Sequence, residues 1–289
     1  MRNGVAEPIV GLVAMLVFSS VLVAQTAAGR GGQGAGAGRG GQSIQGAGPA
    51  PKRDLNGAWV GPGTLGGRAP GTPGGAGRGT RPFPPMTPLG ESLSKLNKPE
   101  PVFRLAGTND PFVNCDPLGF PRNVLNHAVI SAGMRIAQLP DRMIMLYQYQ
   151  RVWREIWTDG RALPKNVDAK GGPDSRFYGY SVGHWDGDYT FVIDTVGSDD
   201  RTWLDTAGHP HSVDAHFVER YTRVDQNTIK LTLTIDDSKI YTKPFDWIVD
   251  AAYTWIPTQE FEETFCVPSE GIEYRDSLAR PAGSGEPTR

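Results

Sequence analysis

The chain has 289 residues and a mass of 31.3 kDa, which suits one large domain or two small ones. Its formal net charge of -2 and its isoelectric point near 6.2 exclude a general attraction to nucleic acid or to anionic membranes. Hydrophobic residues make up only 38% of the chain, and most of the 37 glycines lie before residue 80. The shortage of apolar residues is therefore concentrated near the N-terminus.

The first segment, residues 1–28, has the pattern of a signal peptide. Arg2 precedes an apolar run from Ile9 to Ala24, which is shorter than the about 20 residues that a membrane-spanning helix needs. Small residues follow, so cleavage is expected after Ala24 or Ala28. We predict export to the periplasm or the medium, with no stable membrane insertion after cleavage; an uncleaved anchor is the alternative.

Residues 29–81 form a leader rich in glycine and proline. A segment with so few apolar side chains cannot offset its backbone entropy by burial, so we expect it to be disordered. The short island "RDLNGAWVG" interrupts it. Around Trp59, residues 55–60 are expected to form a first strand docked on the body of the protein, with a linker as the alternative.

A single β domain is predicted over residues 82–275, and it opens with a short helix. Leucines recur at helical spacing within residues 89–96, after a start signal at Thr87 or Pro88 and before a stop at Pro99. A disordered tail is expected over residues 276–289.

Beyond residue 128 the hydrophobic period changes from helical to two, as in strands. The expected strands are "MRIAQ", "RMIMLYQYQ", "VWREIWT", "YGYSVGHW", "YTFVIDTV", "HFVERYTRV", "TIKLTLTI" and "KIYTKPF". Short connections between them, above all the "WDGD" turn, favour neighbouring antiparallel strands, and closure would hide the sheet edges. We predict a mainly β fold, an antiparallel up-and-down barrel of lipocalin-like shape, with a twisted β-sandwich as the alternative.

Alternation also assigns faces. Ile229, Leu231, Leu233 and Ile235 share one aliphatic face, which should be the core side of their strand. Other strands mix aromatic and polar residues on one face, which is typical of a ligand cavity or of an amphipathic outer surface. The candidate ligand-binding residues are Tyr147, Trp157, Tyr180 and Trp203.

The chain has two cysteines, Cys115 and Cys266. In an exported protein, an even pair predicts one disulfide, here joining the start and the end of the folded region. Two cysteines without further cysteine spacing are a poor signal for zinc.

Several motifs in residues 82–275 occur in a fixed order: "CDPLGFPR", "REIWTDGR", "YSVGHWDGD" and "GHPHS". Together they resemble a widespread family of secreted bacterial proteins that carries no assigned activity. The resemblance implies export, and it implies no reaction.

The segment from Trp203 to His216, "WLDTAGHPHSVDAH", contains three of the five histidines. His209 and His211 would face the same side of a strand, as metal ligands must, but Gly208 and Pro210 favour a turn, where that rule fails. We therefore predict no metal and no other cofactor.

Acid/base chemistry is the second interpretation of this segment. Asp205 is placed to orient His209 or His211 as a proton carrier, and Arg161 beside Asp159 is suited to hold an anionic or carbonyl group. These five residues are the candidate catalytic set. The third interpretation is structural, because such residues at strand ends commonly satisfy backbone groups.

Neither a nucleophile elbow nor a phosphate-binding loop occurs in the sequence. The first hypothesis is therefore a binding module for a small, partly apolar molecule, with no nucleic-acid partner. The alternative is a cofactor-free hydrolase, lyase or isomerase with a His/Asp/Arg site at the barrel rim. An interaction protein of the cell envelope is the third hypothesis.

Overall fold

The structure is a computed structural model that describes six stretches of the chain: residues 48–61, 83–99, 108–126, 133–258, 260–263 and 265–269. The expected signal peptide, most of the leader and the expected tail lie outside the described residues. Within the described stretches, no helix is long and apolar enough to cross a membrane.

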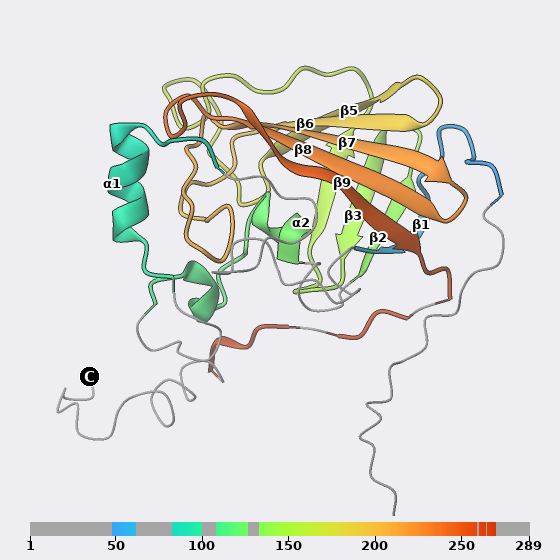
Figure 1. The fold of residues 1–289 in the computed structure, drawn as a ribbon, viewed down its shortest axis with the longest axis horizontal. Helices are drawn as coiled ribbons and strands as arrows, with labels where there is room; N and C mark the ends of the chain where they lie inside the picture. The colour runs from blue at the N-terminus through green and yellow to red at the C-terminus, as the bar shows by residue number, and fades with distance from the viewer. Residues whose placement is uncertain are drawn as a thin grey trace, which may run out of the picture. The chain divides into compact units, whose positions relative to one another are not determined.

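A closed β-barrel dominates the described part of the chain (Figure 1), which confirms the prediction of a mainly β fold. Its nine strands follow chain order around the ring, and the last pairs with the first. The strands are β1 (Gly57–Val60), β2 (Gly133–Gln138), β3 (Arg142–Tyr147), β4 (Trp153–Trp157), β5 (Tyr180–Asp186), β6 (Thr190–Val196), β7 (His216–Asp225), β8 (Thr228–Asp236) and β9 (Phe245–Trp255).

One strand pair departs from the predicted antiparallel meander. β4 and β5 are parallel, joined only through the pairs Ile156↔Ser181 and Trp157↔Val182. Residues 158–179 form a long connection that brings the chain back to the end of the barrel where β4 began, and a parallel pair requires such a return. The barrel is therefore mixed, and its β4–β5 seam is short.

The last predicted strand was wrong, and the true one was missed. Residues 239–244 form turns and one isolated bridge rather than a strand, because Ile240 and Tyr241 both donate backbone hydrogen bonds to the Asp237 carbonyl. β9 follows instead. Its alternation is interrupted by a register shift opposite Leu231 and Leu233, where Asp250 takes a positive φ of 52°. A bulge of this kind hides the period of two.

Two elements near the N-terminal side of the domain agree with expectation. β1 pairs with both β2 and β9 and so closes the ring, with Trp59 fully buried. The helix α1 (Pro88–Leu96) begins after Thr87, whose hydroxyl accepts a hydrogen bond from the Gly90 amide. Figure 1 shows α1 outside the ring of strands. A Cβ at Gly90 would lie 2.5 Å from the Ile240 carbonyl oxygen, so only glycine allows this close packing.

Side chains fill the inside of the barrel. The predicted face of β8, from Ile229 to Ile235, is fully buried, which confirms the assignment. Aromatic rings such as Phe191 and Tyr221 join it, and the short helix α2 (Arg122–Asn126) adds Val124 to the same core. The interior is thus a packed core, as in other small barrels.

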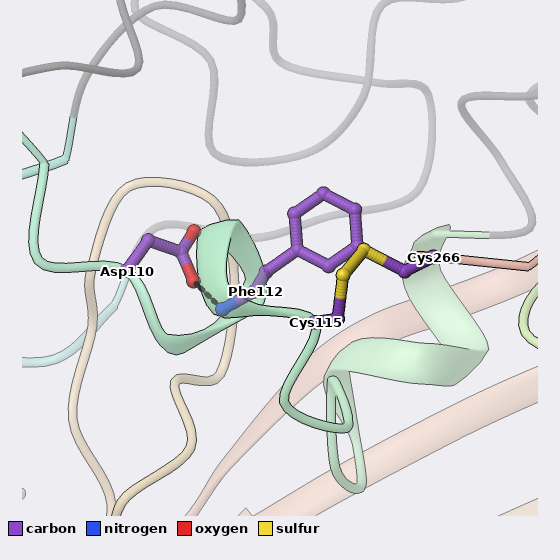
Figure 2. The surroundings of a disulfide bond; sticks show 4 residues. All are labelled: Asp110, Phe112, Cys115 and Cys266. Atoms are coloured by element: carbon purple, nitrogen blue, oxygen red, sulfur yellow. Dashed lines mark hydrogen bonds between the residues drawn. A yellow bond between two sulfur atoms is a disulfide. The ribbon is translucent and has the colours of Figure 1, made fainter. Parts of the chain in front are cut away.

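The predicted disulfide is present between Cys115 and Cys266, which are 151 residues apart in sequence (Figure 2). Cys115 ends the short 3-10 helix η3 (Pro111–Asn114), which Asp110 caps by accepting a hydrogen bond from the Phe112 amide at 3.0 Å. Asp110 also forms a buried ion pair with Arg122, at 2.6 Å. The bond therefore fixes the C-terminal segment to a rigid turn beside α2.

Candidate functional site

A pocket with a volume of about 630 Å³ lies over the β4–β5 seam. Strand β4, strand β5 and the connection between them supply its walls. Its lining consists of Trp153, Arg154, Glu155, Trp157, Arg161, Ala162, Leu163, Pro164, Arg176, Phe177, Tyr178, Gly179, Tyr180, Ser181 and Val182. Five aromatic side chains and three arginines therefore meet in one concavity.

The alternation of β4 explains why this wall is aromatic. Arg154 and Ile156 face the barrel interior, while Trp153, Glu155 and Trp157 face outward, and Trp153 is 63% exposed. An indole this exposed on a pocket wall is a preformed apolar contact surface for a ligand.

The positive charges of the pocket are held in place by stacking. The Arg161 guanidinium lies 3.4 Å from the centre of the Trp157 ring and bonds both carboxylate oxygens of Asp159. Hydrogen bonding from Arg161 lowers the pKa of the Asp159 carboxyl. The guanidinium of Arg142 also lies over Trp157, at 3.9 Å. Such cation–π contacts orient a guanidinium without neutralising it.

Beneath the pocket floor lies a fully buried charge pair. Arg154 contacts Glu219 at 2.8 Å, and the two side chains are 1% and 0% exposed. Tyr147 and Tyr221 extend this network: the Tyr147 hydroxyl accepts from Arg154 at 3.2 Å, and the Tyr221 hydroxyl donates to Glu219 at 2.9 Å. Burial raises the pKa of both tyrosines, so they remain neutral hydrogen-bonding groups at neutral pH.

Further buried hydroxyls complete the network around Arg154. Ser181 and Thr195 each bond its Nη2 atom at 3.2 Å, and they bond each other at 2.9 Å. Ser181 also belongs to the pocket lining. Ser181 therefore connects the pocket to a buried polar cluster around Arg154, whereas most of the barrel interior is apolar.

Most of the histidine segment lies between β6 and β7, and two of its histidines contact a carboxylate: His209 contacts Asp205, and His216, the first residue of β7, lies 2.9 Å from Asp194. His209 Nδ1 is 2.7 Å from Asp205 Oδ2, with the Asp205 side chain 1% exposed. Asp205 also accepts backbone hydrogen bonds from Ala207 and His209. The imidazole stacks on Phe83, with ring centroids 3.9 Å apart. Asp205 thus orients one histidine and braces its own turn.

His211 has a different environment. It is 1% exposed, and its Nε2 and Nδ1 atoms lie 2.9 Å from the Thr202 hydroxyl and 3.1 Å from the Ser212 carbonyl. Burial lowers the pKa of His211, so the ring is held neutral. With both ring nitrogens occupied, His211 serves as a structural brace.

The structure separates the residues that the sequence grouped into one site. Trp157, Tyr180 and Arg161 line the large pocket, and Asp159 pairs with Arg161 beside it. The lining includes no residue of the histidine segment. Two further candidates are core residues: Tyr147 is 1% exposed, and Trp203, at 4%, packs under the Arg122 guanidinium.

The sequence candidates include only three of the fifteen lining residues, and those missed include Trp153, Arg154 and Arg176. Arg154 lies on the inward face of β4, where alternation predicts core residues, and Trp153 shares the outward face with the candidate Trp157. Arg176 stands in the irregular connection, where no period exists; its proximity to the motif residue Tyr180 is the only local signal.

No group of three or more histidine, cysteine, aspartate or glutamate side chains suited to a metal occurs among the residues the structure describes. Comparison with protein-family models, with curated proteins and with solved structures finds no match to this chain.

Proposed function

We propose that this protein is exported and binds a small, partly apolar molecule in the β4–β5 pocket. The observation that carries the proposal is the lining itself: five aromatic side chains beside oriented guanidinium groups in a concavity of about 630 Å³. Ligand sites of small molecules typically measure roughly 300 to 1,000 Å³ and combine apolar walls with few polar groups. The disulfide is compatible with export, because such bonds persist in oxidising compartments.

The site lies outside the packed barrel interior, over the short parallel seam. This location differs from the ligand cavity expected inside the barrel, because large side chains occupy the interior. The rigid strands fix the aromatic wall, and the connection over residues 158–179 forms the opposite wall, an arrangement common to binding sites built on a scaffold.

The test is to identify small molecules that remain bound to the exported protein during purification, by native mass spectrometry. Trp153→Ala removes an exposed pocket wall at little structural cost, and Tyr189→Ala is the matched control, since Tyr189 is 40% exposed in the β5–β6 turn, outside the lining. We expect a stoichiometric ligand on the wild type and the control and a weakened one on Trp153→Ala. Equal retention by both variants would contradict the proposal.

A second candidate function rests on the Asp205–His209 pair. The carboxylate fixes the Nδ1 tautomer, and Nε2 has no hydrogen-bond partner among the described residues, as a general base requires. Phe83, which stacks on His209, lines another pocket, of about 510 Å³. Hydrolysis of chromogenic esters that is lost in His209→Gln and kept in Trp153→Ala would favour this function over simple binding.

A further inference from the structure

The charged side chains that line the β4–β5 pocket differ in whether they have a partner of opposite charge within the protein. Four charged side chains line it: Arg154, Glu155, Arg161 and Arg176. Three of these have carboxylate or guanidinium partners within the protein, namely Glu219 for Arg154, Arg142 for Glu155 and Asp159 for Arg161. Among the ion pairs of the described residues, none includes Arg176. Arg176 is therefore the one charged group of the lining that has no oppositely charged partner among the described residues.

The position of Arg176 is fixed by its backbone and by one ring. Its amide donates to the Gly197 carbonyl at 3.0 Å, and its carbonyl accepts from the amides of Gly179 and Asp199, each at 2.9 Å. The guanidinium lies 4.2 Å from the centre of the Tyr180 ring, which is itself held by a hydrogen bond to the Asp174 carbonyl. The side chain is exposed, so its donors face solvent with their direction already set.

From this unpaired guanidinium we infer that the ligand of the pocket is a monoanion, a flat apolar body carrying one carboxylate or similar oxyanion that Arg176 binds. The inference rests on the proposed function of the pocket and names the chemical class of its ligand. A guanidinium presents paired N–H donors that match the two oxygens of a carboxylate. The exposed indole of Trp153 supplies the surface on which the flat body stacks.

A plain structural role for Arg176, covering Tyr180, predicts no preference for charge. Two fluorescent probes with nearly the same body separate the alternatives: anilinonaphthalene sulfonate, which is a monoanion, and phenylnaphthylamine, which is neutral. Both are titrated onto the full exported chain. The monoanion should bind more tightly, and added salt should weaken its binding alone, because the arginine is exposed to screening ions.

The decisive variants change Arg176. Arg176→Gln should weaken the sulfonate about fivefold, as expected for an exposed charge pair, and leave the neutral probe unchanged. Arg176→Lys keeps the charge and should restore most of the sulfonate affinity. Arg220→Gln is the control, since Arg220 is an exposed arginine of β7 that pairs with Asp186 away from the pocket lining. Thermal unfolding confirms that each variant is folded.

The outcomes distinguish the two proposals. If both probes bind and Arg176→Gln weakens neither or both equally, the monoanion inference is overturned while the binding pocket stands. Failure of Trp153→Ala to weaken either probe, or absence of binding by both, overturns the pocket itself and the inference with it.

Discussion

Breaking the buried pair of Arg154 and Glu219 should be among the most damaging single changes to the stability of this barrel. Glu219→Gln keeps the shape of the side chain and removes the charge, which leaves the Arg154 guanidinium buried without a counter-ion. Removing one partner of such a pair costs about 3 to 5 kcal/mol, because the remaining charge has lost its solvation and its partner. Domains have total stabilities of only about 5 to 15 kcal/mol, so this loss is a large part of the whole.

Replacing both partners tests the same reasoning from the other side. In the double variant Arg154→Met with Glu219→Leu, no charge remains in the core, and the hydroxyls of Ser181 and Thr195 keep their mutual hydrogen bond. The double variant should therefore lose less stability than either single change. Tyr221 loses its bond to Glu219, so some loss remains.

Urea unfolding followed by tryptophan fluorescence, with the disulfide intact, measures each free energy of unfolding and the coupling between the two sites. A loss below about 1 kcal/mol in Glu219→Gln, with an unchanged urea dependence, would refute the claim that this charge depends on its buried partner.

Three other predictions concern stability. Burial lowers the pKa of His211 below its ordinary 6.5, so on acidification the unfolded chain binds a proton before the folded protein does. The free energy of unfolding should therefore fall as the pH drops below about 6.5, by at most about 1.4 kcal/mol per pH unit. Urea unfolding at several pH values measures this fall, which should be shallower in His211→Gln. Replacing Cys115 and Cys266 by serine removes a link between residues 151 apart in sequence, so calorimetry should show the free energy of unfolding fall by up to about 5 kcal/mol. An unchanged melting temperature would show that the bond does not constrain the unfolded chain. In Gly183→Ala the added Cβ would lie 2.6 Å from the Phe191 ring, so urea unfolding should show the free energy of unfolding lowered by about 1 to 3 kcal/mol. The control Gly187→Ala should cost less, because its Cβ meets no atom within 4 Å and only the positive φ of 71° is unfavourable.

A small part of the candidate pocket was within reach of the sequence because local patterns carry it. Trp157, Arg161 and Tyr180 were selected from motifs at strand ends, and they line one pocket. Arg176 was not, because it lies in an irregular connection where no periodicity links a residue to a face. Asp205 was expected to orient His209 or His211, and it contacts His209, since four residues of a tight turn are enough to bring the two together.

The sequence by itself determined the strands of regular alternation, the helix start at Thr87 and the β-rich class, because these depend on contacts a few residues apart. Only the tertiary structure decided how the chain returns to make β5 parallel to β4, since that pairing depends on the path of the whole connection over residues 158–179. The pocket exists because of that short seam. Folding likewise brings together Arg154 and Glu219, which are 65 residues apart, as one buried ion pair. Their spacing in the sequence does not predict this contact.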